Sequence, residues 1–487
     1  MKRLFSLIAT GVVTAFVYLF SSPACAAMQE EALSANTLGY DTKVLSERLG
    51  RAVQFQTVSY EDKAQFNKEA FTGFQKFLEQ EFPKVHAAMK KEVVGDYSLL
   101  FTWPGRDHQE LPTLLAAHMD VVPDDSESGN QWTYPPFHGR IADGFVWGRG
   151  TLDDKVSVLG ILEAAEKLLQ AGYVPRQTIY IAFGHDEESG GNAGAAIISE
   201  LLKARGIKLD YVLDEGLTIT EGMVPNITRP VALIGIAEKG CLSVELSVES
   251  TGGHSMMPPA QTAIGILSAA INKLEQNQFP TRMEAPVRKM FETLSPEMPM
   301  GLKIVFSNLW LFEGLVEKKL ASAPRTNALV RTTMAPTIFN AGVKENILAP
   351  RARAVVNFRL LPGDTTVKTL LSVQKIINDP RVKIKMLARM KSEPSRVADT
   401  ESKGYQTVQK TIRQIFPQAL VAPGLVLAVT DSRHYADLTN NILHFSPIRL
   451  RPEDLQRIHG RDERISLEDY RDVVKFYTQL IRNEGNP

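Results

Sequence analysis

The sequence predicts an α/β fold, in which a mostly parallel β-sheet with helices on both faces carries an inserted α+β domain. Apolar runs of strand length alternate with helical segments between residues 112 and 216, and this order builds parallel sheets. From about residue 240 to 361 amphipathic patterns replace the alternation. A chain of 487 residues, 44% of them hydrophobic, is long enough for two domains.

The elements of the first domain follow from length and hydrophobic pattern. Short apolar runs predict buried strands, whereas longer segments with a helical period predict the helices between them. The predicted strands cover residues 112–118, 178–184 and 211–214, and the predicted helices cover residues 155–173 and 192–206. In such sheets ligands gather beyond the carboxyl ends of the strands.

The inserted domain is predicted from three segments. The alternating segment 241–250 predicts a half-exposed strand, residues 263–276 an amphipathic helix, and residues 352–362 another strand. The apolar segment 301–315 is expected to form the core of this domain, with the lining of an apolar pocket as the alternative. The predicted boundaries are 45–239 and 362–487 for the first domain and 240–361 for the insert.

The N-terminus has the layout of a secretory signal. A basic start precedes an apolar run at residues 4–20, and Ala24-Cys25-Ala26 fits the small-residue cleavage rule. We therefore expect residues 1–26 to be a signal peptide and the protein to be periplasmic or secreted. An uncleaved membrane anchor is the alternative, because the apolar run is near the lower limit for spanning a bilayer. A lipidated Cys25 is disfavoured by Ser22.

The charge balance excludes one class of partner. Lys and Arg together number 55, as do Asp and Glu, so the net charge is zero. No general attraction to nucleic acid follows. Without the signal, Cys241 is the remaining cysteine, so no intrachain disulfide is expected.

Metal-ligating residue types follow successive predicted strands. The set comprises His118, Asp153, Glu187 with Glu188, and Asp214. The spacing of His118 and Asp120 places both side chains on one side of a strand. His118 can therefore bind a metal while Asp120 orients its imidazole ring. If these two residues are considered without the others, the alternative is a hydrogen-bonded pair with a purely structural role. Clustered acids at the strand ends instead predict two divalent cations that neutralise them.

Eight motifs resemble one family in order and over nearly the whole chain after residue 45. They are HMD, GRGTLDDK, GHDEESGG, LDEG, TGGHSMMP, NFRLLPGD, TDSRHY and RIHG. They are similar to the dinuclear-zinc exopeptidases and amidohydrolases: aminoacylase, glutamate carboxypeptidase, carnosinase and succinyl-diaminopimelate desuccinylase. The branch most similar is that of carboxypeptidase S and the secreted N-acyl-amino-acid hydrolases.

The resemblance implies a zinc-exopeptidase catalytic domain, a lid and dimerisation domain, and two Zn²⁺ ions per subunit, with Co²⁺ or Mn²⁺ as alternatives. His118 with Asp214 would hold one ion, Glu188 with His459 the other, and Asp153 would bridge them. A cis peptide between Asp153 and Asp154 is implied as well.

The implied reaction is hydrolysis of an amide. Glu187 would act as general base and acid, and Asp120 would hold His118. His254 would stabilise the oxyanion, in this family often from a partner subunit of a homodimer. Its alternative is a loop histidine without a role.

The implied substrate carries a free carboxylate beside the scissile amide. Arg359 would bind it, with Asn346 as a polar companion. Arg433 is a weaker candidate, since a structural arginine fits equally. Two kinds of enzyme would have these same residues. One is a carboxypeptidase that acts on short peptides with an apolar residue, and the other is an enzyme that hydrolyses or synthesises N-acyl amino acids. The rivals are a non-catalytic binding protein of the same fold, disfavoured by the intact ligand positions, and a mononuclear aminopeptidase, which would not need Arg359.

Overall fold

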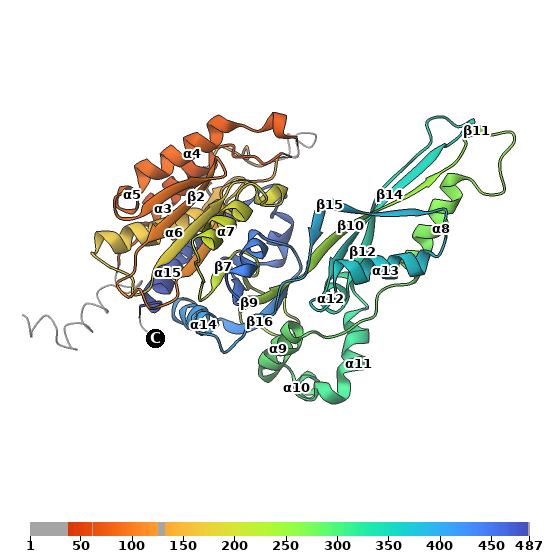
Figure 1. Ribbon diagram of the computed structural model, residues 1–487. Coiled ribbons are helices and arrows are strands. Elements are labelled where there is room, and N and C mark those ends of the chain that lie inside the picture. Colours follow the sequence, from red (N-terminus) through yellow and green to blue (C-terminus); the bar gives the residue numbers. More distant parts are fainter. Residues whose placement is uncertain (1–37, 61, 125–131, 486–487) are drawn as a thin grey trace, which may run out of the picture.

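The computed structural model describes residues 38–60, 62–124 and 132–485. Figure 1 shows a helix-covered sheet domain joined to a narrower domain with its own sheet. This architecture confirms the predicted fold class. The predicted signal peptide, residues 1–26, lies outside the described residues. Within those residues no helix is both long and apolar enough to cross a membrane.

The larger domain is built on a ten-stranded mixed sheet. Its path runs β1-β2-β6-β3-β7-β17-β9-β8-β18, with β16 paired to β9. The pairs β3 with β6, β3 with β7 and β7 with β17 are parallel. The strands are β1 (Lys90–Val94), β2 (Ser98–Trp103), β3 (Thr113–His118), β6 (Ile179–Gly184), β7 (Val212–Asp214), β8 (Ile219–Thr220), β9 (Val231–Glu238), β16 (Leu420–Val426), β17 (Ile442–His444) and β18 (Arg449–Leu450).

Both faces of this sheet are buried, which explains why its central strands are apolar throughout. One core joins the sheet to helices on one face, and a second core joins the other face to α7 and the 3₁₀ turn η4. On the first face lie α3 (Thr42–Val53), α4 (Lys68–Glu81), α5 (Pro83–Ala88), α6 (Lys155–Gln170), α14 (Lys403–Ile415) and α15 (Leu467–Asn483); on the second lie α7 (Ala195–Ala204) and η4 (Asp431–Asp437). The predicted helices at 155–173 and 192–206 correspond to α6 and α7.

The smaller domain is a four-stranded antiparallel sheet in the order β12-β14-β10-β15. Its strands are β10 (Gly240–Glu249), β12 (Thr333–Ala341), β14 (Arg351–Leu360) and β15 (Lys383–Ser392), and α8 (Ala263–Gln276) packs on it with α13 (Thr366–Ile377). The predicted boundary at residue 361 is therefore wrong. Because β15 pairs with β10 and α13 shares the core of this sheet, the smaller domain continues to Ser392.

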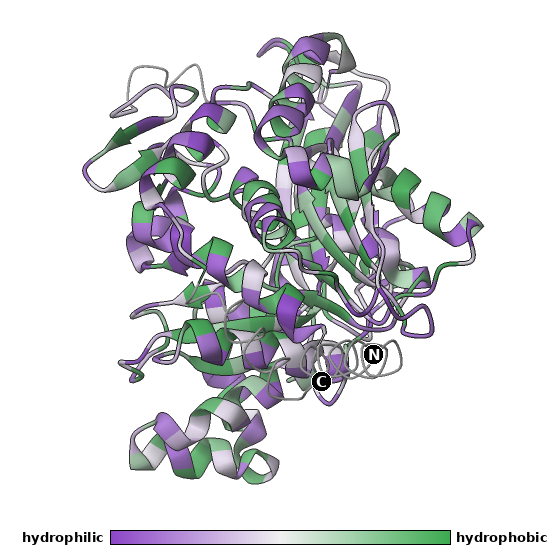
Figure 2. Ribbon diagram, turned by 90° about the vertical axis from the view of Figure 1, so that its left-hand side faces the viewer, coloured by the Kyte–Doolittle hydropathy of each residue, from purple (hydrophilic) through white to green (hydrophobic). Residues whose placement is uncertain are grey.

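A helical lobe is formed by the chain between α8 and β12. It contains α9 (Ala285–Leu294), α10 (Met300–Ser307), α11 (Leu309–Leu320) and α12 (Pro324–Val330). Its buried side chains share a core with β9 and β16 of the larger domain rather than with the antiparallel sheet. Segment 301–315 is thus core on one face only. Figures 1 and 2 show that α10 and α11 project away from the rest of the molecule.

Candidate active site

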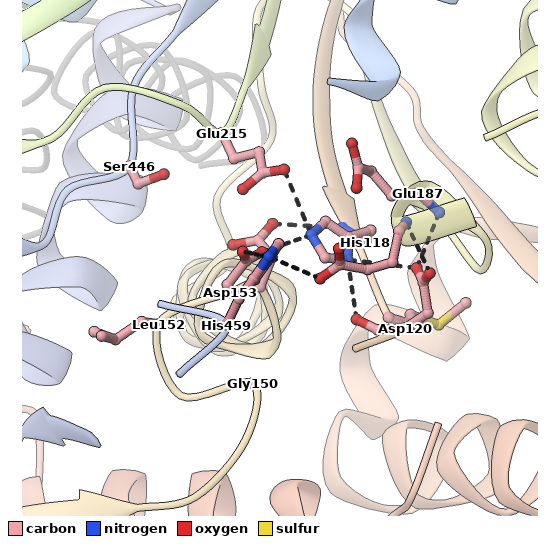
Figure 3. Close-up of polar contacts among 12 residues, drawn as sticks. His118, Asp120, Gly150, Leu152, Asp153, Glu187, Glu215, Ser446 and His459 are labelled. Atoms are coloured by element: carbon pink, nitrogen blue, oxygen red, sulfur yellow. Dashed lines mark hydrogen bonds and ion pairs between the residues drawn. The ribbon is translucent and has the colours of Figure 1, made fainter. Parts of the chain in front are cut away.

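The candidate active site lies at the carboxyl ends of β3, β6 and β7, where the loops carry most of the predicted residues. Figure 3 shows His118, Asp153, Glu187 and His459 converging there. His118 ends β3 and is buried. Its Nε2 atom lies 2.9 Å from Asp153 Oδ1, and its Nδ1 atom lies 3.0 Å from the Asp120 backbone oxygen and 3.4 Å from Asp120 Oδ1. Asp120 therefore fixes the imidazole plane.

Asp120 also holds the following acidic turn. Its carboxylate accepts hydrogen bonds from the backbone N–H groups of Glu187, at 3.2 Å, and Glu188, at 3.1 Å. These two residues begin the 3₁₀ turn η2 (Glu187–Ser189) directly after β6. Asp186, to which the sequence assigned no role, accepts the backbone N–H of Ala193 at 2.7 Å and stabilises the turn.

Asp153 lies between the two histidines. Asp153 Oδ2 is 2.9 Å from His459 Nε2, and that nitrogen is 3.2 Å from Glu188 Oε1. The predicted set His118, Asp153, Glu188 and His459 is thus brought together from four separate parts of the chain. The Asp153–Asp154 peptide is cis, as the resemblance implied.

Glu463 positions the loop that carries Asp153, although no motif in the sequence pointed to this residue. Its buried carboxylate accepts the backbone N–H groups of Gly150 at 2.9 Å and Leu152 at 2.8 Å, and pairs with Arg149 at 2.6 Å. The side chain of Lys155, also buried, donates to the Phe55 backbone oxygen at 2.5 Å. Burial lowers the pKa of Lys155 to about 7. Glu463 and Lys155 therefore hold the Asp153 loop against neighbouring parts of the larger domain.

Glu215, not Asp214, approaches His118, so the structure corrects this prediction. Glu215 Oε1 lies 3.5 Å from His118 Nε2. Asp214 ends β7 and shares a side of the sheet with Val212, because strand side chains alternate. It faces Thr430 and Ser432 on that side. The LDEG motif contains both acids. Only the direction in which each side chain leaves the strand shows which of them approaches His118.

The charges in the site are poorly balanced by protein groups alone. Burial raises the pKa of Glu187 well above its usual range; the charge of His118 opposes this rise, whereas that of Glu215 adds to it. Burial also raises the pKa of Glu215 to about 7, and hydrogen bonds to Asp153 and Glu188 raise the pKa of His459 to about 10. Such crowding of carboxylates against two imidazoles suits divalent cations.

The donor set fits metal ions. One ligand atom each from His118, Asp153 and Glu188 lie within 4.8 Å of one another, as do atoms from His118, Asp154 and Glu215. The ligand types are imidazole nitrogen and carboxylate oxygen, which suit Zn²⁺ and also Mn²⁺ or Co²⁺. The contacts divide into His118 with Glu215 and His459 with Glu188, with Asp153 reaching both sets.

A cleft of about 830 Å³ connects the site to the smaller domain. Glu187, Glu188 and His459 line one side, and Arg359 of β14 lines the other. Among the residues that the structure describes, none accepts a hydrogen bond from the Arg359 guanidinium, which is therefore free to bind an anion. Arg433 also lines the cleft, but it donates to the backbone oxygens of Thr430 at 2.7 Å and Gly190 at 2.5 Å. These bonds favour a structural role for Arg433.

His254 and Asn346 lie elsewhere in this chain. His254 is exposed in β11 (Gly253–His254), which pairs with β13 (Ile347–Leu348). The Asn346 backbone oxygen accepts from Ser255 N at 3.1 Å beside it. Figure 1 places β11 at the end of the smaller domain farthest from β7. The structure brings His254 and Asn346 near each other, but not near Glu187 of the same chain.

A sheet whose strand ends gather histidines and carboxylates, facing a second domain across a cleft, is the arrangement of a metal-dependent hydrolase. The family model described as peptidase family M20/M25/M40 matches residues 114–483. The chain belongs to this family, and it is a metallo-carboxypeptidase or amidohydrolase. The family prediction made from the motifs is confirmed.

Several relatives match over most of their length. The chain is 44% identical to a probable carboxypeptidase S-like protein of Dictyostelium discoideum over 90% of this chain and 85% of the relative. It is 45% identical to an N-fatty-acyl-amino acid synthase/hydrolase of Xenopus tropicalis, over 93% of this chain and 88% of the relative. The relatives' names thus divide between peptides and N-acyl amino acids.

Solved structures share the fold at low sequence identity. A metallo-carboxypeptidase of the M20 family from Sulfolobus solfataricus aligns with a TM-score of 0.67 at 18% identity, covering 91% of this chain and 98% of that chain. Human carnosine dipeptidase 1 aligns with the same TM-score at 14% identity, covering 94% of this chain and 99% of that chain. Both support the two-domain architecture.

Proposed function

We propose that the protein hydrolyses an amide bond next to an amino acid that has a free carboxylate, using two Zn²⁺ ions. Short peptides with an apolar residue, cleaved by carboxypeptidase action, are the first substrate class. The single observation that carries the proposal is the unpaired Arg359 guanidinium across the cleft from Glu187. A buried or half-buried cation without an acidic partner is suited to bind a substrate carboxylate.

N-acyl amino acids, hydrolysed or synthesised, are the second class. The relatives named for N-fatty-acyl amino acids favour it, and so do apolar side chains in the cleft, namely Ile338, Val355, Leu387 and Val429. In both classes the amino acid would bind toward Arg359, and the peptide or acyl side would bind along apolar cleft residues.

The proposed mechanism assigns a task to each group. His118, Asp153 and Glu215 would hold one metal ion, and His459, Asp153 and Glu188 the other. When bound, the ions would polarise the scissile carbonyl and lower the pKa of water. Glu187 takes a proton from the attacking water and delivers it to the leaving amine nitrogen. Asp120 keeps His118 and the Glu187 backbone in place.

We further propose that His254 acts on the active site of a second subunit in a homodimer. Its place at the far end of the smaller domain supports this arrangement, because the exposed imidazole accepts the Met256 backbone N–H at Nδ1 at 3.2 Å, which leaves Nε2 to face another subunit. His254 would donate a hydrogen bond to the oxyanion formed during attack, and Asn346 would accompany it. Export, directed by residues 1–26, remains part of the same proposal.

The experiment that tests the proposed function is one substrate panel. The metal-loaded protein is offered dipeptides, N-acetyl amino acids and long-chain N-acyl amino acids, each with its carboxyl-amidated twin. We expect turnover only of the free carboxylates, and the relative kcat/KM values rank the two substrate classes. Equal turnover of the amidated twins, or no turnover with both metals bound, contradicts the proposal.

Arg359→Ala should raise KM for free-carboxylate substrates about a hundredfold, because a charged hydrogen-bonding pair is lost. Steady-state kinetics with a free and an amidated substrate measure this effect. Arg353→Ala is the matched control, since Arg353 also lines the cleft but is paired with Glu245 at 2.6 Å. An equal loss for both substrates, or for both variants, would remove Arg359 as the carboxylate clamp.

Co-expression of Glu187→Gln with His254→Ala tests the role of the second subunit. Each variant alone should be nearly inactive, whereas the mixture should recover about a quarter of wild-type activity, because half of the dimers would contain one complete site. The activity of the co-expressed mixture measures this quarter, and mixed dimers purified through a different tag on each chain should have about half of wild-type activity. A fully active His254→Ala protein, or a mixture as inactive as its components, contradicts action across subunits.

A further inference from the structure

The helical lobe presents an apolar face that the proposed function does not use. On α11, Trp310 is 79% exposed, Leu311 62% and Leu315 65%. On the preceding α10, Met300 is 72% exposed and Ile304 51%. Large apolar side chains gathered on one protruding lobe indicate an interaction surface. We call these five residues the apolar face of the lobe.

The spacing along α11 separates this face from the core. Leu309, Phe312 and Val316 follow a helical period and belong to the core shared with β9 and β16. Trp310, Leu311 and Leu315 are on the other side of the same helix, and they are exposed. The apolar face is therefore additional to what the fold of the lobe requires.

The exposed charges on the two helices that carry the face have one sign. Lys303, Lys318 and Lys319 are exposed on α10 and α11. The acids of α11 are engaged toward the body of the lobe: Glu313 pairs with Arg288, and Glu317 accepts from Thr281 Oγ1 at 3.1 Å. Exposed charged side chains of these two helices are thus all cationic.

We propose that this lobe docks on an anionic lipid surface. An exposed Trp with Leu, Ile and Met beside it suits the boundary between headgroups and acyl chains, and neighbouring lysines suit anionic headgroups. A second copy of the chain fits less well, because two such faces would bring like charges together. The face also takes no part in lining the catalytic cleft, and the lobe that carries it projects from the rest of the molecule (Figure 2).

Vesicle binding tests the proposal. Wild type and variants, purified in the same processed form so that their N-termini are equal, are mixed with vesicles of phosphatidylcholine alone or with phosphatidylglycerol. Binding is measured by flotation. The triple variant Trp310→Ser, Leu311→Ser, Leu315→Ser should bind anionic vesicles at least about tenfold more weakly. The double variant Lys318→Glu, Lys319→Glu should lose affinity for anionic vesicles and little for neutral ones.

Tryptophan fluorescence gives a second readout. Trp103 and Trp147 are buried and Trp132 is half-buried against Arg149, whereas Trp310 is exposed. Anionic vesicles should therefore shift the emission to shorter wavelength through Trp310. This shift should be absent in Trp310→Phe. The matched control is Leu111→Ser with Val174→Ser, which removes exposed apolar side chains from the other domain and should leave binding unchanged.

Three outcomes overturn the proposal. The wild type does not bind anionic vesicles, or the triple variant binds them as tightly as the wild type. Alternatively, sedimentation shows that the triple variant dissociates a wild-type dimer, which would make the face a contact between copies. An unchanged circular-dichroism spectrum and melting temperature of the triple variant verify that the lobe still folds, so that weakened binding reports the surface itself.

Discussion

Glu187→Gln is expected to lower kcat about a thousandfold while leaving the metal content unchanged. A general base contributes roughly a hundredfold to ten-thousandfold in rate, and the amide cannot accept the proton from water. Burial raises the pKa of Glu187, which is the direction that a group exchanging a proton with water and amine requires. Single-turnover kinetics and metal analysis of the same preparation measure the two quantities together.

The control for this variant is Asp186→Asn. Asp186 lies one residue earlier and only supports the turn, through the backbone N–H of Ala193, so an isosteric amide should retain most activity. If Glu187→Gln keeps more than about a tenth of wild-type kcat, its role as general base is wrong. If it loses metal instead, Glu187 is a ligand rather than the base.

Glu215→Gln is expected to reduce metal content by one ion and to lower kcat/KM more than about a hundredfold. That loss exceeds the range typical of residues that only support a ligand. The reason is geometric, since Glu215 Oε1 lies 3.5 Å from His118 Nε2. Metal analysis after dialysis against a weak chelator, with kinetics before and after metal addition, measures both effects.

Asp214→Asn is the matched comparison, because it changes the adjacent acid in the same way. We expect this variant to keep both metal ions, since Asp214 faces Thr430 and Ser432 on the other side of the strand. The reverse pattern, with metal lost from Asp214→Asn and retained in Glu215→Gln, would restore Asp214 as the ligand. Loss in both variants would indicate a general disturbance of β7.

The sequence by itself determined the fold class, the family and most of the cluster at the strand ends. Alternation of apolar runs and amphipathic segments is a local property, so the helices α6 and α7 and the strands β3, β6 and β7 could be read from it. The motifs predicted four of the clustered residues as metal ligands, namely His118, Asp153, Glu188 and His459. The order of motifs along the chain can be recognised without a structure.

Only the tertiary structure decided the features that depend on direction and distance. It places Glu215 rather than Asp214 beside His118. Asp214 is the last residue of β7, and its side chain points to the opposite side from that of Glu215, which follows it. It revealed Glu463, whose bonds to the Asp153 loop join residues far apart in sequence. It extended the smaller domain to Ser392, since the pairing of β15 with β10 is a long-range contact.

The same reason explains segment 301–315 and His254. An apolar period predicts that a helix buries a face, but not which partner covers it or how much remains exposed, so the half-exposed α11 could not be foreseen. A motif gives the identity of His254, but not its place at the end of the smaller domain. Sequence patterns record local preferences, whereas the meeting of distant segments is set by the packing of the whole chain.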